Sequence, residues 1–469
     1  MRLRASGRFL GTALHLSFIR QFLLNYFQIE ERSSTISTEV FAGITTYLSL
    51  SFVFILNPAI LSASPPDSHG VAMAPASILL ATVITSSLAT IGMGIFAKLP
   101  LAVGPGIEVS AFFTYVLVQR MHLSWEEALF AVVLSGLLNF ILTLFSIRER
   151  IVEAIPEGLK ASLLLTIGVF VLLVGFKLGN VIDVGSFTRL MVTEHGFWAK
   201  SNLLQGPFIL LVGLCTAALF NLRRLRLPWG TLIGIIAAAI ACHLVGVQST
   251  APHDTGQWHQ TFWKASPAAV WTPTFWNGVI IMFVIDFVGG ISKIYALTDG
   301  THIPRKGDKV PGLQPALFVD GVATFFGGWF GTSSLIAFVE SRIGIEAGGQ
   351  TGLSAVVCGL LMLAGGIFSE LLVLIPPQAA AGVLVYVGCL LIALNCRSLR
   401  RLPLNSMDGI VVIAMAALVA ISFQFHYAMV LGFSAYFVRA WRQGVPVQSI
   451  FWLGLVAASL LGTLPLWML

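Results

Sequence analysis

Three acidic residues lie inside otherwise apolar stretches of the chain, where a carboxylate can do chemistry: Glu108, Asp286 and Glu340. An ionised acid in the middle of a membrane costs roughly 2.5–3.5 kcal/mol on insertion scales, so such residues usually face a cavity and carry function. A desolvated carboxylate can exchange a proton near neutral pH, and it also accepts paired hydrogen bonds from the flat donor edge of a heterocyclic base. The three acids therefore indicate a binding site that also exchanges protons.

Each acid also has a structural interpretation. Asp286 could cap a neighbouring helix, Glu340 could accept hydrogen bonds from backbone amides, and Glu108 could pair with a Lys or Arg elsewhere. We expect Lys293, one to two turns from Asp286, to extend its ammonium group toward the inner membrane surface. The other acidic residues are expected in loops or at the ends of apolar stretches. The sequence favours a functional role for Glu340 and Asp286 and leaves Glu108 open.

Two of the acids lie in segments whose sequence interrupts a helix. The first reads LAVGPGIEVSAFF (101–113) and the second GTSSLIAFVES (331–341). Pro and Gly cost about 3 and about 1 kcal/mol in a helix interior, and broken backbone at membrane depth is tolerated only where it is buried in protein or lines a cavity. A pair of interrupted segments at corresponding positions indicates the binding site of a transporter.

The composition predicts the elements that hold these segments. Hydrophobic residues make up 57% of the 469 residues and charged residues only 10%, and the mean hydropathy is +0.88. Long apolar stretches in a chain of this composition cross a membrane as helices. We therefore expect an all-α polytopic membrane protein, with a further span or a tail helix at 449–468 and with spans at 39–62, 75–97, 101–119, 128–147, 160–176, 206–221, 229–248, 274–297, 314–329, 332–345, 352–374, 377–395, 407–424 and 427–440.

Basic residues orient this layout. With a cytoplasmic N-terminus, all but five of the 27 Lys and Arg lie in the N-terminal arm and in the loops on the inner side. The positive-inside rule then places both ends of the layout in the cytoplasm. The formal net charge of +6 suits anionic lipid heads rather than nucleic acid.

The chain divides at the polar loop 249–273, which is expected outside the cell. Seven spans precede it and seven follow, and because seven is odd the second set must start from the opposite side of the membrane, as an inverted repeat requires. The domain organisation expected is therefore a cytoplasmic arm, a first repeat, the loop, a second repeat and an apolar tail, at 1–38, 39–248, 249–273, 274–441 and 442–469.

Several motifs resemble one family. Over about residues 24–441, the chain resembles the AzgA-like purine permeases of the nucleobase–ascorbate transporter superfamily, within the nucleobase:cation symporters. The motifs that carry the resemblance are YFQIEERSSTISTEVFAGITTYLSLSFVFILNPAILS (26–62), GPGIEVSAFF (104–113), IDFVGG (285–290), THIPRKGDKVPGLQPALFVDGVATFFGGWFGTSS (301–334) and FVESRIGIEAGGQTGLSAVVCGLL (338–361).

The resemblance implies a uracil-permease-like fold of seven-plus-seven inverted segments, with a core domain that moves against a gate domain. The third and tenth segments would each begin as a short strand, with the substrate between them and beside the eighth. By position, Glu340 matches the substrate-binding acid of the tenth segment, and Asp286 matches the acid of the eighth. The further substrate-binding candidates are Ser110 (usually Asn in relatives), Glu108, Phe338, Ser334 and Gly289.

Two departures from the family pattern affect the expected specificity. The eighth segment of relatives reads Asp-Thr-x-Gly-Thr, whereas this chain has Asp286-Phe287-Val288-Gly289-Gly290 and so lacks both hydroxyls. Glu108 stands where relatives usually have glycine, so we expect it to tune specificity rather than to be indispensable.

The function implied by the resemblance is proton-coupled uptake of a purine nucleobase, of the hypoxanthine, guanine, adenine or xanthine class, across the inner (plasma) membrane. Asp286 and Glu340 would couple transport to protons, and a homodimer is compatible with the sequence. One alternative is an anion exchanger or channel of the same fold, which the acids disfavour; another is a non-transporting membrane sensor. The sequence shows no nucleophile–base pair that would indicate an enzyme. We expect no cofactor and no metal.

Overall fold

A computed structural model of the chain describes residues 20–67, 70–145, 156–184, 190–191, 205–221, 230–247, 259–298, 311–366, 375–399, 407–423 and 425–443. The segment 449–468 and most of the basic inner loops lie outside these ranges, as do residues 1–19 of the arm.

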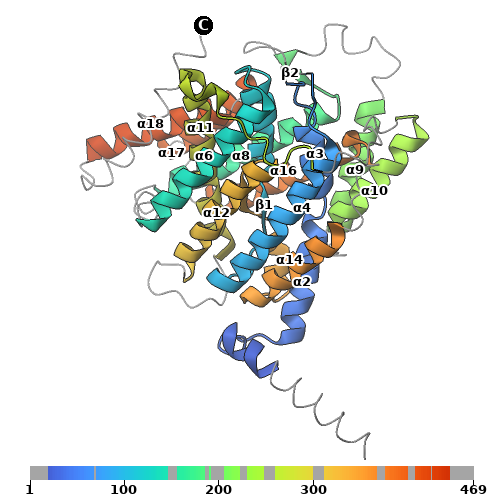
Figure 1. Cartoon of the computed structure of the whole chain (residues 1–469), viewed down its shortest axis with the longest axis vertical. Coiled ribbons are helices and arrows are strands. Elements are labelled where there is room, and N and C mark those ends of the chain that lie inside the picture. Colours follow the sequence, from blue (N-terminus) through green and yellow to red (C-terminus); the bar gives the residue numbers. More distant parts are fainter. Residues whose placement is uncertain are drawn as a thin grey trace, which may run out of the picture.

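The helices form two sets, each of which packs mainly within itself (Figure 1). The second helix group packs on the two long helices α8 and α16. Its members are α8 (Glu157–Leu178), α9 (Gln205–Asn221), α10 (Gly230–Leu244), α16 (Pro377–Leu399), α17 (Met407–Ser422) and α18 (Phe425–Gln443). The other set, the first helix group, contains α2 (Ile36–Leu50), α3 (Val53–Leu61), α4 (Pro75–Gly92), η1 (Met93–Ala97), α5 (Ile107–Ala111), η2 (Phe112–Val118), α6 (Trp125–Leu144), α11 (Pro273–Thr298), α12 (Leu313–Phe330), α13 (Ser341–Glu346) and α14 (Gly352–Gly365).

Five helical stretches in the described part of the chain are long and apolar enough to cross a membrane: Ile36–Leu61, Pro75–Ala97, Trp125–Leu144, Gly158–Leu178 and Pro273–Tyr295. Shorter apolar helices accompany them, among them Gly230–Leu244 and Gly352–Gly365. The protein is therefore a multi-pass membrane protein.

Two strands meet inside the first helix group. β1 (Val103–Pro105) and β4 (Leu335–Ala337) pair antiparallel, with Val103 opposite Ala337 and Pro105 opposite Leu335. Figure 1 shows β1 between α12 and α4, and both helices contact the strand pair. All six strand residues are fully or almost fully buried. Pairing satisfies backbone groups that would otherwise be left without partners in an apolar interior.

A second small sheet lies between the spans expected at 160–176 and 206–221. β2 (Asp183–Val184) pairs antiparallel with β3 (Leu190–Met191) directly after α8. The chain is therefore helical with two two-stranded sheets in its described part, rather than purely helical.

Small residues let helices of one group approach closely. A Cβ added to Gly136 of α6 would lie 2.3 Å from the backbone nitrogen of Phe325 in α12, and one added to Gly382 of α16 would lie 2.2 Å from the carbonyl oxygen of Leu210 in α9. Such close backbone approach is how membrane helices gain packing energy without a hydrophobic driving force.

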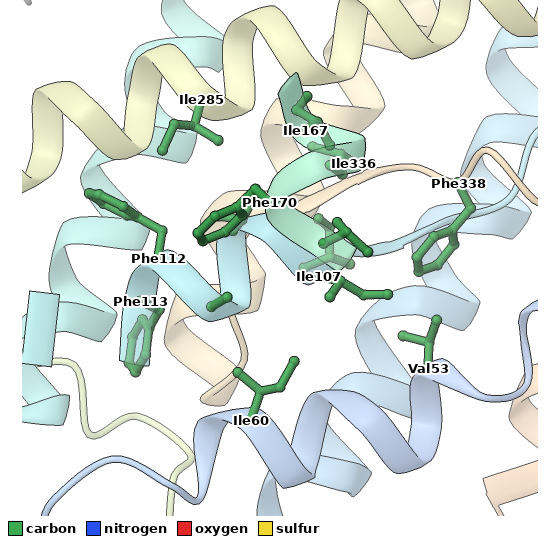
Figure 2. Packing of buried hydrophobic residues seen from close by; sticks show 14 of the residues in the cluster. Val53, Ile60, Ile107, Phe112, Phe113, Ile167, Phe170, Ile285, Ile336 and Phe338 are labelled. Atoms are coloured by element: carbon green, nitrogen blue, oxygen red, sulfur yellow. The ribbon is translucent and has the colours of Figure 1, made fainter. Parts of the chain in front are cut away.

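The two groups meet along an apolar seam on α8 (Figure 2). Ile167 and Phe170 of α8 lie among Ile107, Phe112 and Ile336 of the first group, in one buried cluster. Ile107 is the first residue of α5 and Ile336 the central residue of β4. The second group therefore packs directly against the strand pair and the helix that follows it.

The first turn of α2 and the residues before it are anchored to the rest of the first helix group. Glu39 in the first turn of α2 accepts hydrogen bonds from the backbone N–H groups of Gln350 (2.9 Å) and Thr351 (3.2 Å), at the N-terminus of α14. Arg32 donates to the carbonyl oxygens of Lys98 (2.6 Å) and Gln350 (3.0 Å). A carboxylate is stabilised at a helix N-terminus, so these contacts fix α14 and the segment leading into β1.

Candidate functional site

The strand pair sets two helix starts side by side. The N–H of Gly106 donates to the carbonyl oxygen of Ser334 (3.2 Å), and the N–H of Phe338 donates to that of Ala102 (2.9 Å). α5 begins at Ile107, directly after β1, and α13 begins at Ser341, soon after β4. Both breaks in the sequence thus end in short helices. The first N–H groups of α13 are already bonded, because Ser341 donates to the carbonyl oxygen of Phe338 (3.2 Å) and Arg342 donates to that of Val339 (2.9 Å).

Ser110 belongs to a buried network of hydroxyl and amide groups. Its Oγ lies 2.7 Å from Asn57 Oδ1 and 2.7 Å from Ser333 Oγ. The Asn57 amide in turn donates to the hydroxyls of Thr82 (2.7 Å) and Thr332 (2.9 Å). This network ties α3, α4 and α5 to the chain before β4. Asn57 is not among the residues predicted from the sequence, although a polar Asn-Pro pair inside an apolar helix is a usable signal.

Ser334 and Phe338 flank β4 and are both buried. The Ser334 hydroxyl lies 3.1 Å from the Thr324 hydroxyl of α12, which also bonds the backbone of Leu335. The Phe338 ring lies on Gly104 of β1, where an added Cβ would be 2.3 Å from the ring. Ser334 therefore holds the strand in place, and Phe338 covers its partner strand with an aromatic face.

Glu108 forms a buried ion pair with Lys293. The two atoms, Lys293 Nζ and Glu108 Oε1, are 2.6 Å apart, and both side chains are almost fully buried. Gly289, one turn before Lys293 on α11, leaves room beside this pair, because a Cβ added there would lie 3.9 Å from Glu108 Oε1. The expectation that Lys293 extends to the inner surface is wrong, since Glu108 gives its ammonium group a partner inside the protein.

Glu340 completes this cluster. It lies between the end of β4 and the first residue of α13, is half-buried, and makes no capping hydrogen bond to the helix. Its carboxylate interacts electrostatically with both Lys293 and Glu108. The structure thus brings Glu340, Glu108, Lys293 and Gly289 together, with two acids and one base.

Asp286 lies on the same helix as Lys293 but has a different partner. Asp286 is fully buried and accepts a hydrogen bond from the amide of Asn139 on α6 (2.6 Å). Seven residues separate Asp286 from Lys293, a rise of about 10 Å along the helix axis. Asp286 therefore belongs to the contact between α11 and α6, beside the ion-pair cluster rather than in it.

One buried acid contradicts the expectation that the remaining acids lie in loops or at span ends. Asp320 is fully buried in the middle of α12. The next residue, Gly321, packs on the backbone of Asn139 and Phe140, so Asp320 lies near the residue that bonds Asp286. A carboxylate inside LFVDGVATFF was a detectable signal. Among the described residues, no group of His, Cys, Asp and Glu could hold a metal ion.

Comparison with known proteins gives consistent matches along nearly the whole chain. A model of the Permease family (Xan_ur_permease) matches residues 37–429. The chain is 28% identical over 421 residues to adenine permease AdeQ of Escherichia coli (strain K12), covering 88% of this chain and 89% of that protein. It is also 28% identical over 378 residues to the guanine/hypoxanthine permease PbuG of Bacillus subtilis (strain 168), covering 78% of this chain and 83% of that one. These matches confirm the resemblance to purine permeases.

Two solved structures share the fold at low sequence identity. The overall structure of SLC26A9 matches with a TM-score of 0.61 at 12% identity, covering 93% of this chain and 70% of that one. The transmembrane domain of the cyanobacterium bicarbonate transporter BicA matches with a TM-score of 0.56 at 14% identity, covering 84% of this chain and 96% of that one. At these identities the likeness extends to the fold alone.

Proposed function

This chain belongs to the Permease family, and from that premise we propose that it is a secondary active transporter for proton-coupled uptake of a purine nucleobase across the inner membrane. It is not an enzyme, because the proteins it resembles are permeases of a transporter family. The observation that carries the proposal is the half-buried Glu340 at the end of the paired strands, in a chain similar to adenine and guanine/hypoxanthine permeases.

In this proposal Glu340 binds the base. A carboxylate accepts two parallel hydrogen bonds, and a purine presents N–H donors along its edge. Phe338 supplies an aromatic face near the carboxylate, and the helix start at Ile107 supplies N–H donors for carbonyl oxygens. Ser110 and Ser334 act through the strands that they hold, because their hydroxyls already have partners.

Proton coupling is assigned to Asp286, with Glu340 as a second titrating acid. Asp286 is enclosed, and its carboxylate accepts a hydrogen bond from the neutral amide of Asn139. A hydrogen bond from a neutral amide can be kept in both protonation states of the acid, and two interacting acids can titrate as a coupled pair.

Transport requires the first and second helix groups to move relative to each other. The first helix group would be the core domain and the second the gate domain, and β1 and β4 would occupy corresponding positions of two inverted repeats. Both ends of α8 carry a lysine over a ring of the first group: Lys160 Nζ lies 5.3 Å from the Tyr295 ring centre and Lys177 Nζ lies 3.9 Å from that of Tyr115. These cation–π contacts would close the seam on opposite sides of the site.

The alternative is an anion exchanger or channel, since BicA is a bicarbonate transporter with this fold. An anion site needs a positive or neutral charge, whereas the cluster of Glu340, Glu108 and Lys293 carries a formal charge of −1 with all groups ionised. This negative formal charge favours a neutral base with N–H donors over an anion as the substrate.

Uptake of radiolabelled bases tests the proposal. Cells that lack purine transport and express this chain should accumulate one or more purines, and unlabelled bases should compete. Expression at the membrane without uptake of any purine would refute the proposal. In vesicles with an imposed proton gradient, Asp286→Asn should still bind base but lose accumulation.

Glu340→Gln should mainly weaken binding. Loss of a hydrogen bond to a charged group costs roughly 1.5–3 kcal/mol, or about a tenfold to hundredfold loss in affinity, measurable by calorimetry. If both acid variants bind and accumulate base like the parent, the acids are structural.

We also propose that both ends of the fourteen-span layout are cytoplasmic. A single cysteine placed beside Arg224 or Arg401, in a background without native cysteines, should resist an impermeant thiol reagent in intact cells. A cysteine beside Trp258 should react. The reverse pattern would refute this orientation.

A further inference from the structure

We propose that Lys293 makes this site select purines with an oxo group at C6 over purines with an amino group at C6. The inference rests on the proposed purine transport and adds a specificity-determining residue to it.

Lys293 is held in one position. Its Nζ lies 2.6 Å from Glu108 Oε1, the residue is almost fully buried, and Glu108 is its hydrogen-bond partner within the described part of the chain. An ammonium group has three N–H donors and no acceptor. Two donors therefore remain after Glu108 is bonded, and the enclosure keeps them near Glu340, with which Lys293 interacts electrostatically.

In this proposal Lys293 offers a donor and Glu340 an acceptor to the same base. Hypoxanthine and guanine present the matching pattern, because the acceptor O6 lies beside the donor N1–H, with the acceptor N7 on its other side. Lys is a recurrent partner of the O6 and N7 atoms of guanine, and the carboxylate can take N1–H. Adenine presents the opposite pattern at its N1–C6 edge: its N6 amino group would point hydrogen atoms at the ammonium, and its N1 lone pair would face the carboxylate. Adenine offers an acceptor beside a donor only with N7 and N6–H, and that pairing requires the ring to turn from the position that hypoxanthine takes.

Glu108 acts as a positioning residue in this arrangement. The pair that it forms with Lys293 is neutral as a whole, so the formal charge left for the base is that of Glu340 alone. The pair therefore adds a directed donor to the site without changing its net charge. The Glu108–Lys293 pair therefore determines which base is recognised.

Hypoxanthine and adenine are the matched ligands for the test, because they differ in the C6 substituent and in the proton on N1. Calorimetry on the purified full chain should give tighter binding of hypoxanthine, by about 5- to 150-fold, from the 1–3 kcal/mol by which such a contact discriminates between bases. The double variant Glu108→Gln/Lys293→Met removes the charge of both partners. Its ratio of the two dissociation constants should fall toward one. A purely structural role of the pair would weaken both bases alike and leave the ratio unchanged.

Lys293→Arg provides the control, because a guanidinium group is also a donor without an acceptor. This variant should keep the preference for hypoxanthine, and it also serves if the double variant does not fold. Equal or tighter binding of adenine by the parent overturns the inference, and so does a preference that survives in the double variant or vanishes in Lys293→Arg. A parent that binds neither base and transports no purine refutes the proposed function itself.

Discussion

The Glu108–Lys293 pair should behave as one unit in stability. At 2.6 Å and an effective dielectric constant of about 20, the attraction between the two charges is about 6 kcal/mol. Desolvation offsets much of this attraction, since each buried ion costs several kcal/mol. Removing one partner leaves the other charge buried and alone, which costs about 3–5 kcal/mol, whereas replacing both by apolar or neutral groups is often close to neutral.

The perturbation is a double-mutant cycle of Glu108→Gln, Lys293→Met and both together. Each single variant should lower the free energy of unfolding by about 3–5 kcal/mol, and the double variant should recover most of that loss. Unfolding by SDS in mixed micelles, followed by circular dichroism, measures the differences. If the losses of the single variants add in the double variant to within about 0.5 kcal/mol, the two charges do not interact and the account of the pair is wrong. For the same reason, Glu108→Gly should disturb the protein more than its position as a glycine in relatives suggests.

Three further predictions concern the packing around the pair. Gly104→Ala should cost about 1–3 kcal/mol of stability by overpacking, because the new Cβ would lie 2.3 Å from the Phe338 ring; Phe338→Leu in the same chain should restore the melting temperature, and no restoration would refute the clash. Asn57→Leu should cost about 1–3 kcal/mol in thermal unfolding, because it removes the hydrogen bonds that the buried amide makes to the hydroxyls of Thr82, Thr332 and Ser110; an unchanged melting temperature would contradict this. Tyr115→Leu should raise amide hydrogen exchange in the last turn of α8 but not in its first, because it removes the nearer of the two rings beside Lys177, those of Tyr115 and Phe423; equal exchange at both ends would argue against the contact.

The sequence predicted the location of the site better than its contacts. Gly104, Pro105 and Gly106 marked an interruption, and the structure has a strand there because this backbone cannot continue a helix. Glu340 was found because an acid in an apolar segment stands out. Both signals are local, so a single sequence carries them.

Partners distant in the sequence could not be predicted in the same way. Glu108 and Lys293 are 185 residues apart, and nothing local in either segment says that their side chains meet. Lys293 was placed at the membrane surface because a lone lysine near the end of an apolar helix usually extends there; a buried carboxylate reverses that preference. The hydroxyl network around Asn57 was missed for the same reason, since its members come from four segments.

The pairing of β1 with β4 has a consequence for how the protein is made. Val103–Pro105 leaves the ribosome about 230 residues before its partner strand, an interval of roughly 10–50 s at 5–20 residues per second. Throughout this time the backbone groups of β1 have no strand to bond, and an unpaired backbone group in lipid costs several kcal/mol. The first half of the chain must therefore wait, shielded by water or by the insertion machinery, until Leu335–Ala337 arrives. A nascent chain stopped before β4 should consequently remain open to degradation, however completely its earlier helices have inserted.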